Sequence, residues 1–439
     1  MKGLRRIFWP ALLLLAVAAG ADDRPTVVVT DPSARAYRVA LQTFADRGPA
    51  KDATRVKRLR EALAGALEFS GLFDVIDPKA FLGPVESAAF DERLVCSDWS
   101  QIRADVLVQG EIHSVGEGLT VEYRVVDVAR ACRSLRRHRY RGRTRDTVTM
   151  ARRVADDVVA AFTGKPGVAS TEIAFVSNRS GSPEIYLMDA LGGNLRAITT
   201  TGSIDQFPSW HPDGDEIVYT SYREDGRPHI FVLARVGRSG RILRALAPTQ
   251  SQYRAVFAPD GKRLAVAATA GGASEIFTAL RTGRSLRRLT RNRSIDISPS
   301  WSPDGEQIAF VSDRSGSPQI YVMRANGTGV RRITFNGSYN ASPAWSPDGR
   351  WIAYEARVAG GQFDIWLVDP EGETNLPLVS HPRSDEGPSW SPDGRKLVFS
   401  SARRGSHDLY RVDVSGRNLR RITRGPGDDK SPSWGPYPR

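Results

Sequence analysis

Cysteine and histidine are scarce in this 439-residue chain, and neither occurs in a metal-binding pattern. The two cysteines, Cys96 and Cys132, can form a disulfide in an oxidising compartment, but the sequence leaves open whether they lie close enough. The six histidines are scattered without the spacing of metal ligands, and His211, which replaces a serine in a repeated turn, is expected at the surface. We therefore predict no cofactor and no metal site built from these residues.

Long hydrophobic runs are absent except at the N-terminus. Lys2, Arg5 and Arg6 precede an apolar run over residues 7–19, and small residues follow at 19–21. This pattern predicts a cleavable secretory signal over residues 1–21, too short to span a membrane. No cysteine follows the predicted cut, so we expect a mature chain without a lipid anchor or membrane insertion, exported from the cytoplasm.

Acidic residues are outnumbered, and the formal net charge is +13. Much of the excess lies in arginine pairs that recur along the chain, at 287–288, 331–332 and 420–421. A nucleic-acid-binding protein would gather such charge on one face beside aromatic stacking platforms. The regular recurrence instead predicts exposed strand positions, so we expect no nucleic-acid binding.

Motifs of catalysis are missing as well. The sequence contains no Gly-x-Ser-x-Gly, no phosphate-binding glycine loop and no His-Glu-x-x-His. The aspartates of the repeated turns occupy equivalent places in different units, so they lie apart rather than as a catalytic pair. We predict no catalytic residues and a protein that is not an enzyme.

What the sequence has in abundance is a repeat. Aromatic residues recur at intervals of 44 to 47 residues, at Trp210, Phe257, Trp301, Trp345, Trp390 and Trp434. Periods of this length indicate propellers or helical arrays. Each unit contains short runs rich in β-branched and aromatic residues, separated by Asp-Gly and Asn-Gly turns, which favours a four-stranded antiparallel sheet. In the repeated Trp-Ser-Pro-Asp-Gly, the last three residues form a turn, and the tryptophan is expected to fill the gap between neighbouring sheets.

The first unit lacks its aromatic strand and begins directly at residues 172–177. Residues 431–439, at the opposite end of the chain, can supply it. This predicts a six-bladed β-propeller over residues 172–439, closed by the C-terminal strand, with no open sheet edge.

Residues 22–165 show no such repeat. They read as strands at 26–30, 37–44, 105–112, 119–128 and 134–142, with helices at 52–69 and 146–162. The pattern predicts a small N-terminal α/β domain, joined to the propeller by a linker over residues 166–171.

Binding is the function that this organisation favours. The loops between blades vary in sequence while the strands repeat, and variable loops on a rigid frame are where specificity resides. These loops cover residues 200–208, 248–254, 291–299, 335–343, 381–388 and 424–432. Two hypotheses stay open here: an adaptor for protein partners, or a secreted propeller that binds or hydrolyses a carbohydrate or peptide.

Four blocks of the chain, at 70–81, 99–112, 119–128 and 152–181, resemble successive blocks of the TolB family. These are periplasmic propeller proteins of the Tol-Pal system. Arg152 departs from the family, which commonly carries histidine there, and this difference bears on domain packing.

The resemblance implies a monomeric, non-enzymatic periplasmic adaptor that supports outer-membrane integrity and constriction at cell division. It would bind the Pal lipoprotein with one propeller face and TolA with the N-terminal segment of the mature chain. The Pal-like contacts implied on the propeller are Asp205, Gln206, Ser251, Gln252, Tyr253, Ile297, Asn340, Asp385 and Asp429. The TolA-like contacts implied in the N-terminal segment are Asp22, Asp23, Val27, Val29 and Asp31.

Overall fold

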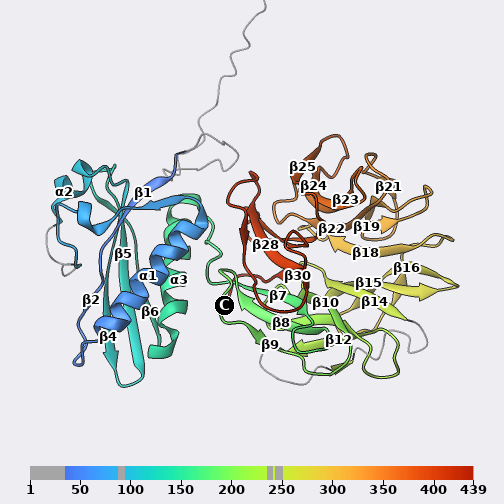
Figure 1. Cartoon of the computed structure of the whole chain (residues 1–439), viewed down its shortest axis with the longest axis horizontal. Helices are drawn as coiled ribbons and strands as arrows, with labels where there is room; N and C mark the ends of the chain where they lie inside the picture. Colours follow the sequence, from blue (N-terminus) through green and yellow to red (C-terminus); the bar gives the residue numbers. More distant parts are fainter. Residues whose placement is uncertain (1–34, 88–93, 235–240, 243–250, 439) are drawn as a thin grey trace, which may run out of the picture.

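The computed structural model describes residues 35–87, 94–234, 241–242 and 251–438, which form two domains side by side (Figure 1). The predicted signal peptide, the strand expected at 26–30 and the five TolA-like contacts lie outside the described residues. In the part of the chain that the structure describes, no helix is long and apolar enough to cross a membrane.

The N-terminal domain is a mixed sheet with the long helices α1 and α3 on one face and the short helix α2 on the other (Figure 1). The order of its strands is β3-β1-β4-β5-β6, and β2 also pairs with β4. The pairs β1–β3, β1–β4 and β2–β4 are parallel, whereas β4–β5 and β5–β6 are antiparallel. The strands are β1 (Tyr37–Leu41), β2 (Ala45–Asp46), β3 (Phe73–Val75), β4 (Val106–Val115), β5 (Gly118–Asp127) and β6 (Arg133–Arg143), and the helices are α1 (Ala53–Ser70), α2 (Cys96–Gln101) and α3 (Thr147–Thr163).

Alternation along the strands divides the side chains between two cores. Val39, Leu41, Val106 and Val108 face α1 and α3, whereas Leu107 faces α2 on the other side of the sheet. Both long helices lie within one residue of the predicted bounds. Asp52 caps the N-terminus of α1, because its carboxylate accepts a hydrogen bond from Arg55 N at 2.9 Å. Gly71 caps the C-terminus with a φ of 75°.

The cysteines form a disulfide that joins the start of α2 to the turn between β5 and β6. Cys96 and Cys132 are 36 residues apart in sequence, and both pack against the core formed by Leu107 and Trp99. The sequence left open whether the two cysteines lie close enough to form a disulfide, and in the structure they do.

The propeller has six four-stranded antiparallel sheets, as predicted, and strand β30 from the C-terminus completes the first. Blade 1 comprises β30 (Asp429–Trp434), β7 (Glu172–Ser177), β8 (Glu184–Asp189) and β9 (Arg196–Ala197). Blade 2 comprises β10 (Asp205–Trp210), β11 (Glu216–Ser221), β12 (His229–Ala234) and β13 (Arg241–Ile242). Blade 3 comprises β14 (Gln252–Phe257), β15 (Arg263–Ala270), β16 (Ala273–Leu280) and β17 (Arg287–Arg288).

Blades 4 to 6 repeat the same pattern. Blade 4 comprises β18 (Asp296–Trp301), β19 (Gln307–Ser312), β20 (Gln319–Arg324) and β21 (Arg331–Arg332). Blade 5 comprises β22 (Asn340–Trp345), β23 (Ile352–Arg357), β24 (Phe363–Val368) and β25 (Asn375–Val379). Blade 6 comprises β26 (Asp385–Trp390), β27 (Lys396–Ser401), β28 (Asp408–Asp413) and β29 (Arg420–Arg421). The arginine pairs of the sequence are the outermost strands β17, β21 and β29 and are exposed or partly exposed, as predicted.

The repeated aromatic residues are buried between blades. The indole Nε1 of Trp390 donates to the carbonyl oxygen of Ala344 in blade 5 at 2.8 Å, and that of Trp210 donates to Ser433 O in blade 1 at 3.1 Å. His211 is also buried: its Nε2 lies 3.0 Å from the carbonyl oxygen of Gly261 in blade 3, and its ring packs edge-on against Phe257. The expectation of a surface histidine is therefore wrong, because the side chain joins two blades where the repeat usually has serine.

The two domains share a continuous apolar core that includes residues of α1, α3, β7, β8 and β28. The ring of Phe69, near the end of α1, contacts two cations of blade 6: its centroid lies 5.2 Å from Lys396 Nζ and 4.2 Å from Arg411 Cζ. Arg152 of α3 forms an ion pair with Asp189 of blade 1. The residue that departs from the family thus lies at the domain interface, where its cation meets an aspartate of the propeller.

The segment between the domains is held by α3. Asp156, which is buried, accepts hydrogen bonds from Ala169 N at 2.7 Å, Ser170 N at 2.9 Å and Ser170 Oγ at 2.5 Å. The domains are therefore joined by a docked segment rather than by a free linker.

Candidate partner-binding face of the propeller

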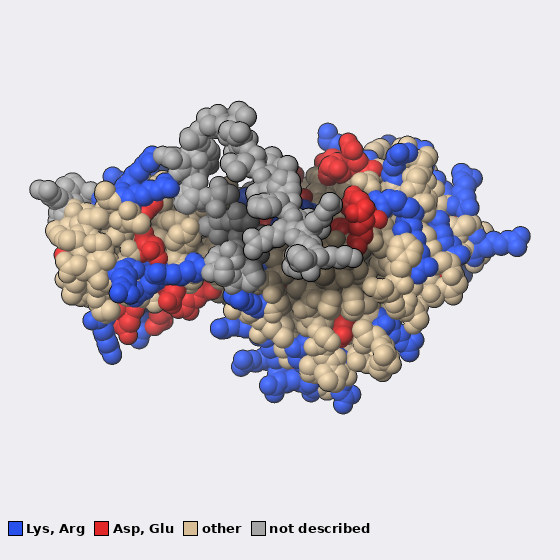
Figure 2. Space-filling view, turned by 90° about the horizontal axis from the view of Figure 1, so that it is seen from above, with Lys and Arg blue, Asp and Glu red and all other residues tan. Residues whose placement is uncertain are grey.

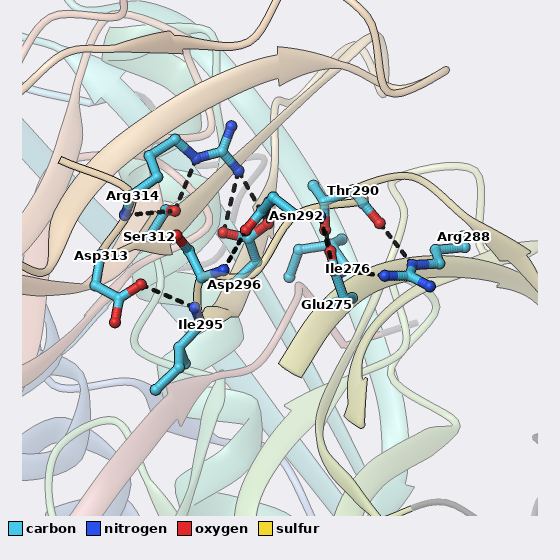
Figure 3. Close-up of polar contacts among 11 residues, drawn as sticks. Glu275, Ile276, Arg288, Thr290, Asn292, Ile295, Asp296, Ser312, Asp313 and Arg314 are labelled. Carbon is cyan, nitrogen blue, oxygen red and sulfur yellow. Dashed lines mark hydrogen bonds and ion pairs between the residues drawn. The ribbon is translucent and has the colours of Figure 1, made fainter. Parts of the chain in front are cut away.

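The loops between blades and the loops between second and third strands lie on the same face of the propeller, because strands alternate in direction within each blade. We call this the inter-blade face, and the face with the Pro-Asp-Gly turns the turn face. A cluster of polar side chains recurs under the inter-blade face at the joints between blades. Figure 3 shows one of these joints, between blades 3 and 4.

The first half of the joint is an aspartate held by an arginine and a serine. Asp296 is fully buried at the start of β18, and Arg314 Nη2 lies 3.1 Å from its Oδ1 and 2.9 Å from its Oδ2 (Figure 3). Arg314 Nε also donates to Ser312 Oγ at 2.8 Å, and its guanidinium lies over the ring of Tyr321. The arginine therefore neutralises the buried carboxylate and ties the first strand of the blade to the loop after the second.

The second half belongs to the preceding blade. Glu275 of β16 accepts hydrogen bonds from Thr290 Oγ1 at 2.5 Å, Asn292 N at 2.9 Å and Arg288 Nη2 at 2.6 Å (Figure 3). Asn292 Nδ2 then donates to Asp296 Oδ2 at 2.7 Å, which links the two halves. The inter-blade loop is thus fixed at both ends by buried carboxylates.

The same aspartate–serine–arginine arrangement recurs in blades 1 and 6. Arg179 Nη2 lies 2.7 Å from both carboxylate oxygens of Asp429, and Arg403 Nη2 lies 3.0 Å and 2.9 Å from those of Asp385. Blade 2 has the same three residue types, but its Arg223 lies over the ring of Phe231, at 3.9 Å. Burial raises the pKa of Asp385 above its ordinary value, although the hydrogen bonds from Ser401 and Arg403 oppose the shift.

Blades 3 and 5 replace the charged pair by neutral residues. Gln252 and Asn340 stand in place of the aspartate, while Ala270 and Val358 stand in place of the arginine. Asn340 Nδ2 donates to Gln319 Oε1 and to Asn336 O, both at 2.8 Å. Because an unpaired carboxylate is costly to bury, the blades that lack the cation also lack the anion.

These contacts change the interpretation of the predicted Pal-like residues. Five of them begin a first strand and have buried side chains: Asp205, Gln252, Asn340, Asp385 and Asp429. They were expected in loops, but the carboxylate and amide groups turn inward to join neighbouring strands. Their side chains therefore hold the frame and do not present polar atoms to a partner.

The remaining four predicted residues are partly buried: Gln206, Ser251, Tyr253 and Ile297. Tyr253 OH lies 3.1 Å from Thr269 Oγ1, and Gln206 Nε2 donates to Tyr222 OH at 3.4 Å. The structure places all four in or beside the first strands, between the buried joints and the rim of the channel.

Apolar side chains that the sequence analysis did not single out are more exposed on this face. Ile204 and Ile295, which directly precede Asp205 and Asp296, are 45% and 49% exposed, and Phe335 in the next inter-blade loop is 66% exposed. The signal that could have found Ile204 and Ile295 is an apolar residue immediately before the repeated aspartate, and for Phe335 it is an aromatic residue at the start of an otherwise polar loop.

In Figure 2, lysine and arginine side chains lie around the edges of both domains, separated by uncharged surface. A small α/β domain next to a six-bladed propeller, with carboxylates buried in the joints between blades, defines a class of two-domain propeller proteins.

Comparisons with known proteins identify the family. A family model described as the TolB amino-terminal domain matches residues 25–133, and one described as the TolB beta propeller domain matches residues 160–246 and 249–438. The chain belongs to the TolB family.

Individual relatives agree with the family models. The Tol-Pal system protein TolB of Anaeromyxobacter dehalogenans (strain 2CP-1) is 38% identical over 300 residues, which cover 68% of each chain. That of Geobacter sulfurreducens is 36% identical over 211 residues, covering 47% of this chain and 48% of the relative. The crystal structure of TolB from Acinetobacter baumannii superposes with a TM-score of 0.76 at 26% identity, covering 92% of this chain and 98% of that one. The prediction of fold and family is confirmed.

Proposed function

We propose that this chain is a non-enzymatic adaptor of a periplasmic Tol-Pal system. Its relatives carry the name Tol-Pal system protein TolB, and the family models match both domains. The predicted signal over residues 1–21 is consistent with export. In this role the protein links envelope components and supports outer-membrane integrity and constriction at cell division.

The proposed partner of the propeller is a Pal-like peptidoglycan-associated lipoprotein, bound on the inter-blade face. The observation that carries this proposal is the exposure of Ile204, Ile295 and Phe335 above the buried joints. Exposed apolar side chains on a rigid frame can be buried by a partner without a large cost in conformational entropy. Tyr253 and Ile297 would line the inner part of the same contact.

The proposed partner of the N-terminal segment is a TolA-like inner-membrane protein. The proposal rests on the family to which the chain belongs and is carried over to the segment from Asp22 to about Arg35, although residues 27–35 depart from the usual family sequence there. Addition of an extended strand to a partner's sheet is the mode we expect. Removal of residues 22–34 should abolish this contact and leave the lipoprotein contact intact.

The test is affinity capture from an envelope extract with purified mature protein, followed by mass spectrometry. Ile295→Asp should weaken capture of a peptidoglycan-associated lipoprotein by at least about tenfold, because it puts a charge in an apolar contact. Leu280→Asp is the matched control: Leu280 is 43% exposed but lies at the end of β16, on the turn face. Equal capture by both variants, or no enrichment of such a lipoprotein by the unaltered protein, would refute the assignment of this face.

A further inference from the structure

The turn-face mouth of the central channel is a cavity of about 370 Å³ that the adaptor role does not use. Its wall is formed by the repeated aromatic residues and by prolines from the ends of the first strands; the aromatic residues are Trp210, Phe257, Trp301, Trp345, Trp390 and Trp434. We call this cavity the funnel. Its volume lies within the range of small-molecule sites, roughly 300–1,000 Å³.

The rest of the wall consists mainly of serines and His211, and among the described residues that line the funnel a single one, Arg254, is an aspartate, glutamate, lysine or arginine. The other five blades carry uncharged residues at the same position of the first strand: Phe207, Ser298, Ser342, Gly387 and Ser431. The cation is therefore a feature of blade 3 and not of the repeat.

The guanidinium of Arg254 makes no hydrogen bond or ion pair to any residue in the described part of the chain. Its Cζ lies 5.6 Å from the ring centroid of Phe207, and the negative charge of Glu355 in blade 5 attracts it. Glu355 is itself engaged, because its Oε2 accepts a hydrogen bond from Gly387 N at 2.8 Å. Both side chains are partly buried in the channel, and this burial lowers the pKa of Arg254 and raises the pKa of Glu355.

We propose that the funnel binds a monocarboxylate with an apolar body, the carboxylate on the Arg254 guanidinium and the body against the ring of tryptophans and prolines. A guanidinium with free N–H groups matches a carboxylate in two parallel hydrogen bonds. One cation with a carboxylate nearby disfavours a dianion such as a phosphate monoester, because Glu355 repels the second charge. The ligand can be a free small acid or the C-terminal carboxylate of a peptide, since both present the same chemistry.

This site is separate from the proposed lipoprotein contact, because the funnel opens on the turn face and Ile204, Ile295 and Phe335 lie on the inter-blade face. Loss of one contact should therefore leave the other unchanged, and either proposal can fail without the other.

The first experiment measures binding to the full mature protein by calorimetry and tryptophan fluorescence. The probes are 3-phenylpropionate with its neutral amide, and the dipeptide acetyl-Ala-Phe with a free or an amidated C-terminus. The acid should bind roughly 10- to 100-fold more tightly than the matching amide, as expected for a charge-assisted pair. Whether the small acid or the peptide acid binds more tightly identifies the source of the ligand.

Variants then locate the site. Arg254→Gln should abolish the preference for the acid, and Arg254→Lys should retain part of it. Glu355→Gln should strengthen acid binding several-fold, because it removes the repelling charge while its side-chain oxygen can still accept from Gly387 N. Arg287→Gln, an exposed arginine on the outermost strand of the same blade, is the control and should change nothing.

Three outcomes overturn the proposal: no saturable binding of either acid to the folded protein, equal affinity for acid and amide, or an unchanged preference in Arg254→Gln. If Arg254→Gln does not fold, the comparison of acid with amide on the unaltered protein and the gain in Glu355→Gln still decide the question.

Discussion

The buried aspartate–arginine pair of blade 4 predicts a large and asymmetric loss of stability when one partner is removed. Asp296 is fully buried, whereas the Arg314 side chain keeps 26% of its surface exposed. Arg314→Met leaves the carboxylate buried without its cation. Removing one partner of a buried pair costs about 3–5 kcal/mol, and we expect the lower value because Arg314 still touches solvent.

The reverse change is milder. Asp296→Asn removes the buried charge, and Arg314 can then turn further into solvent, so we expect a loss of about 1–2 kcal/mol. The double variant reproduces the neutral joint of blade 5, where an amide and Val358 stand in these places. Its stability should lie close to that of Asp296→Asn, so the coupling energy in the double-mutant cycle should equal the loss in Arg314→Met, about 3 kcal/mol.

Blade 5 supplies the opposite test of the same reasoning. Aspartate is the commonest residue at this position of the repeat, so a repeat consensus favours Asn340→Asp. The structure predicts destabilisation by about 3 kcal/mol, because the new carboxylate would be buried against Gln319 Oε1 and Asn336 O, which now accept from Asn340 Nδ2.

The assay is urea unfolding followed by tryptophan fluorescence, which reports mainly on the propeller because most tryptophans lie there. A thermal scan should show the Arg314→Met transition roughly 6 °C below that of the unaltered protein. The reasoning is refuted if Arg314→Met stays within about 0.5 kcal/mol of the unaltered protein, if the double variant loses the sum of both single losses, or if Asn340→Asp is stabilising.

Four further outcomes can be measured on the same protein. Cys96→Ser with Cys132→Ser should lower the unfolding free energy of the N-terminal domain by about 4 kcal/mol, from the closure entropy of a loop of 36 residues, and reductant should then have no further effect. Burial raises the pKa of Asp156 to about 6, above its value in the unfolded chain. The folded chain therefore binds the proton more tightly, and the free energy of unfolding should fall as the pH rises from about 4 to about 6. Asp156→Asn should flatten this dependence, and parallel curves of unfolding free energy against pH for the two proteins would contradict the prediction. Phe69→Ala should lower the free energy of unfolding by about 3 kcal/mol and split one thermal transition into two, because the two domains would unfold separately. A single unshifted transition would show that the domain interface does not depend on this ring. Deletion of residues 429–439 removes the strand that pairs with β7 and should leave a propeller that is cleaved rapidly by trypsin, in contrast to a resistant full-length chain.

The site was predicted less completely than the fold. Residue spacing identified the inter-blade loops but not the direction of their side chains, and Asp205, Asp385 and Asp429 look in the sequence like ordinary polar loop residues. Asp385 and Asp429 are held by Arg and Ser residues of the adjoining strand and loop, and Asp205 by hydroxyl groups, which only the folded sheet brings near. His211 was misplaced for the same reason, since its partner Gly261 belongs to another blade.

What the sequence determined by itself is the part of the molecule that local signals encode. Alternating strand residues and Asp-Gly turns were enough to predict the six blades, because each of these signals depends on neighbours in the chain. The closure joins strands far apart in sequence, and it could be predicted because the first unit lacks one strand and the C-terminus has one to spare. Only the tertiary structure determined the features that depend on residues far apart in sequence. These are the disulfide between Cys96 and Cys132, the burial of the joint aspartates, and the position of Arg254 near Phe207 and Glu355 in the channel. Burial and charge pairing act between groups far apart in sequence, so no local pattern specifies them.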